Sequence, residues 1–185
     1  KLPVERIIMG EPELPGTVLR LPMVYGPDDY QYRFFPYLKR MDDGRRQLLL
    51  DDGMAAWRST WGYVDNVAAA IALAATDARA AGRIYNVAED DASPPMAEWV
   101  RLIGEAAGWD GELGVVPKEQ LPDALVAKLD TRQHLVVDAS RIRAELGYRP
   151  HVPRDEAFQR TVAWERANPP AELDPAVYDY AAEDE

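Results

Sequence analysis

The spacing of apolar residues changes repeatedly along the chain, and these changes predict an alternation of helices and strands. Apolar residues at helical spacing, often followed by Gly or Pro, predict helices over residues 1–10, 31–41, 65–76, 93–108, 138–147 and 154–167. Short apolar runs that end in turn residues predict strands over residues 17–24, 48–50, 57–63 and 83–88. This alternation favours an α/β fold. The run at 17–24 lacks polar alternation, so we expect a strand buried on both faces with neighbours on both sides.

Two of the predicted helices can be placed more closely by their end residues. In the helix at 93–108, Ser93 stands where an N-cap belongs, Pro94 would be the first helical residue and Gly108 would end the helix. The stripe that we expect this helix to bury is Met96, Trp99, Val100 and Ile103. In the helix at 65–76, Asp65 is the expected cap. The residues expected to face the core there are Val67, Ile71 and Ala75.

Composition excludes several classes of function. The chain has 185 residues, enough for one domain, and its 47% hydrophobic and 29% charged residues are typical of a soluble globular protein. A net charge of −11 opposes binding to nucleic acid or to an anionic membrane surface. There is no cysteine and there are only two histidines, so no disulfide and no metal site is expected. No apolar stretch approaches the about 20 residues of a membrane span, and no signal-peptide pattern is found, which predicts a cytoplasmic location.

Short sequence motifs follow one another in a recognisable order. They read LRLPMVYGP at 19–27, YVDNVA at 63–68 leading to YNVA at 85–88, DASR at 138–141 leading to ELGY at 145–148, and RTVAW at 160–164. Together they resemble the extended short-chain dehydrogenases/reductases of the NAD-dependent epimerase/dehydratase family. The resemblance covers residues 1–170 and implies the C-terminal, substrate-binding part of a Rossmann-type α/β fold that lacks the Gly-rich N-terminal half. Residues 171–185 are expected to form an acidic, flexible tail.

The resemblance implies cofactor-binding and catalytic positions. The resemblance implies that Leu21, Pro22 and Met23 lie where the backbone of family members passes the nicotinamide ring. The plainer interpretation is a buried strand that ends in a turn. Lys1 lies at the distance before this strand expected of the lysine in the catalytic Tyr-x-x-x-Lys pair, which binds the cofactor ribose and lowers the tyrosine pKa. The tyrosine would then precede Lys1 and lie outside this sequence. Without the resemblance, Lys1 is a solvated terminal residue.

Substrate contacts are implied at Met23, Arg58 and Lys128. The family commonly has Asn at the position of Met23, and its absence weakens the expectation of a nucleotide-sugar substrate. Arg58 falls where many members bind the substrate's phosphate, and a guanidinium suits that bidentate contact. Taken alone, an arginine beside Trp57 is more often a surface residue packed on an aromatic ring. Lys128 and Asp130 are weaker candidates, because they are out of register with the family's second substrate-contact region.

The sequence contains no Gly-rich turn of the kind that binds a dinucleotide. NAD or NADP is therefore implied for the parent family, and we do not expect this chain alone to bind it. One hypothesis is a part of an NAD(P)-dependent epimerase, dehydratase or reductase that acts on a sugar or related hydroxyl or carbonyl substrate. The alternatives are a stand-alone ligand-binding module without chemistry and a self-associating structural module.

The partners expected from the sequence are a small-molecule substrate and either a second copy of the chain or a missing N-terminal half. Nucleic acid and membranes are not expected. A parallel strand normally has neighbours on both sides and helices on both faces, so the run at 17–24 must be covered by something. We therefore predict self-association or an exposed apolar patch.

Overall fold

The computed structural model describes residues 2–89, 92–123, 125–127 and 129–184. Contacts within the chain divide it into two compact units. Unit 1 consists of Lys1–Tyr25, Thr60–Ser93 and Val136–Pro153, and unit 2 consists of Gly26–Ser59, Pro94–Leu135 and Arg154–Glu185. Each unit contains helices and parallel strands, so the expected α/β class is confirmed. Among the described residues, no helix has the length and apolar character that crossing a membrane requires.

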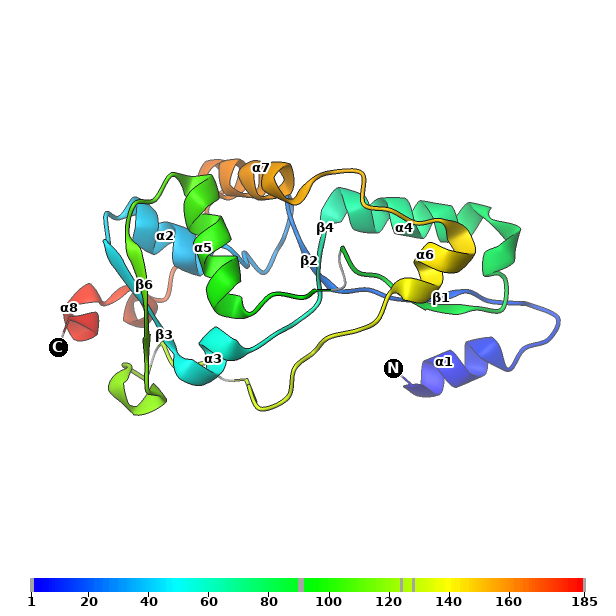
Figure 1. Cartoon of the computed structure of the whole chain (residues 1–185), viewed down its shortest axis with the longest axis horizontal. Coiled ribbons are helices and arrows are strands. Elements are labelled where there is room, and N and C mark those ends of the chain that lie inside the picture. Colours follow the sequence, from blue (N-terminus) through cyan, green and yellow to red (C-terminus); the bar gives the residue numbers. More distant parts are fainter. Residues whose placement is uncertain (1, 90–91, 124, 128, 185) are drawn as a thin grey trace. The chain divides into compact units, whose positions relative to one another are not determined.

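Unit 1 is built on two pairs of parallel strands. Its elements are α1 (Leu2–Met9), β1 (Val18–Arg20), β2 (Met23–Tyr25), β4 (Trp61–Tyr63), α4 (Val64–Thr76), η1 (Ala78–Ala80), β5 (Ile84–Asn86) and α6 (Ser140–Leu146). β1 pairs with β5, and β2 pairs with β4. In Figure 1, α4 and α1 lie on opposite sides of β1. The core between α4, β5 and α6 includes the fully buried Tyr85, Val87 and Ile142.

The apolar run at 17–24 forms two short strands, so the prediction of one strand buried on both faces is wrong. Pro22 carries no backbone N–H and therefore cannot continue a hydrogen-bonded ladder. The pairing changes from β5 to β4 at this point. Before Pro22, the Arg20 carbonyl accepts a hydrogen bond from the N–H of Val87, which directly follows β5; after Pro22, the Met23 N–H donates to the carbonyl of Thr60, which directly precedes β4. Leu21, at the junction, is 46% exposed.

Helix α4 buries a different face from the one expected. The buried residues are Asn66, Val67, Ala70 and Ala74, whereas Ile71 is 43% exposed. Ala75 is exposed as well, so the prediction for these two residues is wrong. The small alanines form the buried face of the helix, and the larger Ile71 is left outside. The predicted cap is also wrong, because the N-cap is Tyr63 and Asp65 lies in the first turn.

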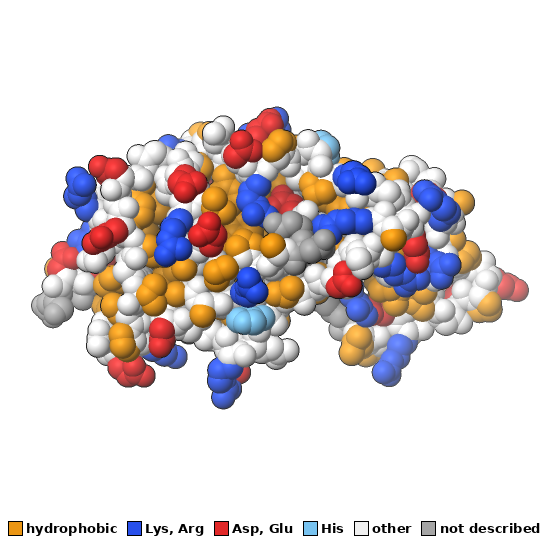
Figure 2. Space-filling view, viewed as in Figure 1, with side chains coloured by type: hydrophobic (Ala, Val, Ile, Leu, Met, Phe, Trp, Pro, Cys, Tyr) orange, Lys and Arg blue, Asp and Glu red, His pale blue; other side chains and the backbone are white. Residues whose placement is uncertain are grey.

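Unit 2 combines one pair of parallel strands with a group of helices. Its elements are α2 (Phe35–Asp42), β3 (Gln47–Asp51), α3 (Asp52–Ala56), α5 (Met96–Ala107), β6 (Glu112–Val116), η2 (Lys118–Gln120), α7 (Arg154–Ala167), η3 (Pro175–Tyr178) and α8 (Tyr180–Glu183). β3 pairs with β6 in parallel. Trp99 of α5 stacks on Phe158 of α7, with ring centroids 5.1 Å apart. Figure 2 shows apolar side chains gathered over this part of the molecule, with charged side chains among them.

Helix α5 begins later than its sequence signals indicate. Its N-cap is Pro95, and Ser93 is a buried residue with φ +37° that belongs to unit 1. A residue before a proline is pushed away from the helical region, so two consecutive prolines delay the helix to Met96. The predicted buried stripe is confirmed, and Gly108 ends the helix with φ +72°, as predicted.

The C-terminal segment makes specific contacts within unit 2. Arg40 donates to the carboxylate of Glu183 at 3.0 Å, and the carboxylate of Asp184 pairs with Arg45. The side chain of Glu183 is only 5% exposed. This carboxylate is therefore not solvated, although the expected mobility of residues 171–185 stays a prediction.

Candidate functional site

β2 and β4 of unit 1 are parallel and paired in register, so their carboxyl ends lie side by side. In sheets of parallel strands, ligands bind at the carboxyl ends of the strands. β2 ends there at Tyr25 and β4 ends there at Tyr63, while the chain after β5 brings Glu89 to the same place. The Glu89 carboxylate accepts a hydrogen bond from the Tyr25 hydroxyl at 3.2 Å and another from the Tyr63 backbone N–H at 2.8 Å. A single carboxylate, on the segment that follows β5, therefore accepts hydrogen bonds at the ends of both β2 and β4.

Asn66, in the first turn of α4, extends this polar cluster. Its amide donates to Glu89 Oε1 at 3.3 Å and to the Val152 carbonyl at 3.0 Å. Its Oδ1 accepts from the backbone N–H groups of His151 and Val152, both at 2.9 Å. Asn66 is fully buried, and the Tyr148 hydroxyl donates to its backbone carbonyl at 3.2 Å. The amide holds the segment before α7 against the start of α4.

The predicted nicotinamide contacts, Leu21, Pro22 and Met23, lie at the junction of β1 and β2. Pro22 packs closely against Gly62 of β4, where a Cβ atom would lie 2.7 Å from Pro22 Cγ. Only glycine permits this approach. Leu21 and Pro22 offer a partly exposed apolar surface between the end of β1 and the start of β2, and their contact with a nicotinamide ring stays a prediction. Lys1, the predicted catalytic and ribose-binding residue, lies outside the described residues.

The predicted substrate residue Arg58 lies in unit 2. Its backbone N–H donates to His134 Nδ1 at 3.2 Å, and its carbonyl accepts from Leu135 N at 2.9 Å. Its side chain is exposed and forms no ion pair with any residue that the structure describes. Lys128 lies outside the described residues, and Asp130 pairs with Arg132 at 2.8 Å.

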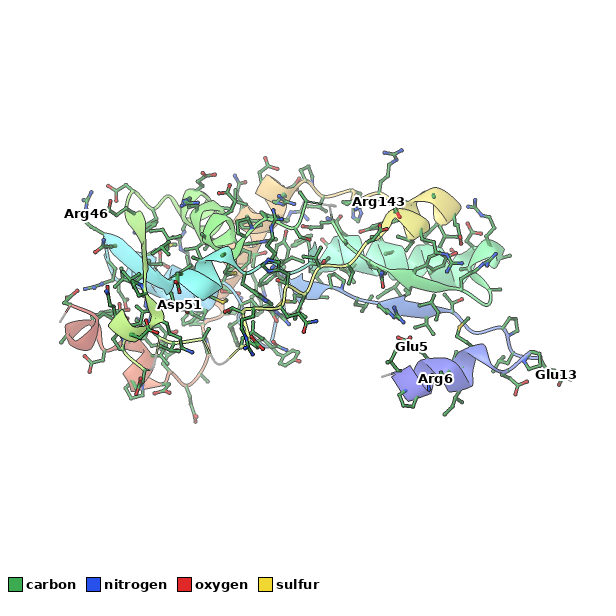
Figure 3. All side chains as sticks on the ribbon, turned by 60° about the horizontal axis from the view of Figure 1, so that its bottom comes forward. Glu5, Arg6, Glu13, Arg46, Asp51 and Arg143 are labelled. Atoms are coloured by element: carbon green, nitrogen blue, oxygen red, sulfur yellow. The ribbon has the colours of Figure 1, made fainter. Side chains whose placement is uncertain are left out.

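A cavity of about 300 Å³ opens in unit 2 beside β3. Tyr37 and Arg40 of α2 line it, together with Asp51 at the end of β3, which Figure 3 labels. The pKa of Tyr37 is raised to about 12, mainly by burial; the charge of Arg40 opposes this rise and that of Asp51 contributes to it. The Tyr37 hydroxyl is therefore neutral at physiological pH and can donate a hydrogen bond.

Several of these residues were missed by sequence reasoning. Glu89, His134 and Tyr37 were not singled out as site residues, because a lone residue of each type is most often solvated or structural. For Glu89 a signal existed: it follows a predicted strand directly, at the end where parallel strands place ligand-binding groups. The described residues contain no group of three or more His, Asp or Glu side chains that could hold a metal ion.

The sequence matches a family model over part of its length. Residues 5–88 match the NAD dependent epimerase/dehydratase family. The chain is 33% identical to a dTDP-glucose 4,6-dehydratase of Streptomyces griseus over 142 residues, which cover 76% of this chain and 39% of that protein. It is 28% identical to protein y4nL of Sinorhizobium fredii over 190 residues, covering 89% of this chain and 52% of that one. The chain thus spans about half, or less, of the length of these relatives.

Solved structures of similar fold include RMD of Pseudomonas aeruginosa in complex with NADPH, with a TM-score of 0.67 at 16% identity over 89% of this chain and 54% of that one. Another is the dTDP-glucose 4,6-dehydratase of Bacillus anthracis with NAD, with a TM-score of 0.66 at 21% identity over 89% of this chain and 50% of that one. Residues 5–88 thus match the NAD-dependent epimerase/dehydratase family, and the chain has the Rossmann-like α/β fold of the extended short-chain dehydrogenases/reductases over about half of their length.

Proposed function

We propose that this chain is part of an NAD(P)-dependent epimerase, dehydratase or reductase that acts on a sugar or a related hydroxyl or carbonyl substrate. The observation that carries the proposal is the junction between the end of β1 and the start of β2, where Leu21 to Met23 offer an apolar surface. This junction lies inside the segment that matches the family model. In the proposed enzyme, these residues flank the nicotinamide ring.

The residues of this chain fit one side of the cofactor. The apolar surface at Leu21 and Pro22 suits a flat ring, whereas the sequence offers no Gly-rich turn for the pyrophosphate. That turn, and the tyrosine paired with Lys1, would come from residues beyond this sequence. When bound, NAD(P) supplies the acceptor or donor of a hydride. The part assigned to this chain is to orient the ring and to bind the substrate.

Arg58 is the proposed anchor for an anionic group of the substrate. Its backbone is fixed on both sides by hydrogen bonds to His134 and Leu135, while its guanidinium remains exposed and unpaired with any described residue. An exposed guanidinium on a fixed backbone can bind a phosphate or carboxylate through two parallel hydrogen bonds. Met23, where the family commonly has Asn, cannot donate to a sugar hydroxyl, so we place the sugar-ring contacts elsewhere.

The test is hydride transfer by the natural protein as its gene encodes it, with NAD or NADP and a panel of phosphorylated and unphosphorylated substrates. Arg58→Ala should raise KM for a phosphorylated substrate by about tenfold or more and leave kcat nearly unchanged, because it removes binding common to ground and transition states. The matched control is Arg46→Ala, which removes an exposed arginine of the same unit that pairs with Asp110 at 3.5 Å. Absence of any NAD(P)-dependent activity or cofactor binding would contradict the proposal.

A self-associating module is the second candidate, and helix α1 is the observation that favours it. Leu2, Val4 and Ile7 are exposed on this helix, and Ile7 is 75% exposed. Glu5, labelled in Figure 3, instead points toward β1 and pairs with Arg20 at 2.6 Å. The helix therefore presents apolar side chains outward, as an interface helix does.

A further inference from the structure

The cavity beside β3 has a largely apolar wall. Leu48 and Leu50 contribute side chains from the strand, Met54 from α3, and Val126 and Ala127 from the segment that follows η2. Its volume of about 300 Å³ lies at the lower end of the range of small-molecule sites. A cavity of this size accommodates one or two fused rings.

Two polar groups in the cavity are available to a ligand. The Tyr37 hydroxyl forms no hydrogen bond with the residues that the structure describes. It is also not among the side-chain polar atoms that are buried from solvent and lack a hydrogen-bond partner. Asp51 Oδ1 accepts the Met54 backbone N–H at 2.7 Å and so caps α3. Asp51 Oδ2 forms no hydrogen bond with the described residues, and it too is not among the atoms that are buried from solvent without a partner. The cavity thus presents one hydroxyl donor and one carboxylate acceptor on an apolar surface.

The positive charge at this cavity is already used within the protein. Arg40 donates through Nε and Nη2 to Glu183 Oε1, at 3.1 and 3.0 Å. It also donates to the carbonyls of Pro36 and Val177. Four of the five guanidinium N–H groups are thereby satisfied, and its charge is balanced by Glu183. A phosphate here would meet the Asp51 carboxylate, and the described residues that line the cavity offer no free cation.

We propose that this cavity binds an uncharged, hydroxyl-bearing apolar ring of the substrate, in place of a nucleoside phosphate. The ligand hydroxyl donates to Asp51 Oδ2 and accepts from the Tyr37 hydroxyl, and its ring packs on Leu48, Leu50 and Val126. This inference rests on the proposed function in one respect, namely that the ligand is the substrate of the enzyme. The binding of such a ring in the cavity does not require the cofactor.

The test is ligand binding to the full chain, measured by fluorescence titration and ligand-observed NMR without any cofactor. The probes are 2-naphthol, 2-naphthyl phosphate and uridine diphosphate. We expect 2-naphthol to bind at least tenfold more tightly than its phosphate ester, and uridine diphosphate not to compete for the cavity. Tyr37→Phe should weaken 2-naphthol several-fold, because the donor to the ligand hydroxyl is lost. Equal or tighter binding of either phosphate compound would overturn the proposal.

A cavity-filling pair of variants locates the binding. Ala127→Phe should reduce binding of 2-naphthol more than tenfold. The matched control is Ala106→Phe, which adds the same ring at a half-buried alanine lining a separate cavity of unit 2, beside α5 and α7, and should leave binding unchanged. No binding of 2-naphthol, or equal effects of the two variants, would overturn the assignment. Loss of hydride transfer with intact 2-naphthol binding would instead count against the proposed function alone.

Discussion

Glu165, on α7, is a carboxylate in the interior of unit 2 that has no cationic partner among the residues that the structure describes. It is fully buried; one oxygen accepts the Phe34 N–H at 3.3 Å, and the other has no partner among the described residues. Burial raises its pKa to about 7, the hydrogen bond from Phe34 opposes this rise, and the nearby charge of Asp29 adds to it. The carboxyl is therefore more easily protonated in the folded chain than in the unfolded chain.

The free energy of unfolding should consequently fall as pH rises. The folded chain binds the proton more tightly than the unfolded chain, so the loss begins near the ordinary pKa of 4.5 and is complete above about 7. At about 1.4 kcal/mol per pKa unit, this loss amounts to roughly 3 kcal/mol. Urea unfolding on both sides of this window measures it. Glu165→Gln should flatten the profile, and an unchanged profile would show that another group is responsible.

Prediction from sequence was best where one residue has one strong preference. Gly108 ends α5 in the left-handed conformation that glycine favours, and this was predicted. The role of Glu165 could not be predicted, because a glutamate in a chain of this acidity is normally solvated. For Glu89 the position directly after a predicted strand was a signal, but this position does not reveal which groups the carboxylate bonds. Their environments depend on residues far away in sequence: Tyr25 donates to Glu89, and Phe34 donates to Glu165.

Among the elements, the long helices were predicted best and the strand pairings least. The α7 bounds agree with the predicted 154–167, whereas α2 begins at Phe35 and not at Gln31. Tyr32 has φ +49°, so the chain turns there before the helix starts. Which strands pair depends on side-by-side placement and on Pro22, and neither is visible in the periodicity of a single run. The apolar cavity beside β3 combines α2, α3 and two distant segments, so no local pattern indicated it.

At the level of elements, Asn66 should be a strong stabiliser of unit 1. Asn66→Ala leaves the buried N–H group of Val152 and the part-buried N–H group of His151 without their acceptor. Two such orphaned donors should lower the free energy of unfolding by about 2 to 4 kcal/mol. The control is Asn86→Ala, which removes one exposed hydrogen bond to the Asp138 carbonyl and should change stability by less than about 1 kcal/mol. Chemical denaturation compares them, and equal losses would contradict the role assigned to Asn66.

For the whole molecule, the apolar surface of α1 predicts self-association. Light scattering at micromolar concentration should show a mass above that of one chain, despite the net charge of −11. Ile7→Glu should shift the protein toward the monomer, because it places a charge in the interface. Ile71→Glu, at an exposed isoleucine on α4, is the matched control and should leave the mass unchanged. A monomeric parent chain would argue against an interface at α1.

The chain passes between the two units after residues 25, 59, 93, 135 and 153. No single cut can therefore release either unit as one continuous piece. During synthesis, the first unit can be completed only when Pro153 has left the ribosome, and by then most of the second has already emerged. We expect the two units to depend on each other during folding, so that a destabilising substitution in either unit lowers the yield of the whole folded protein.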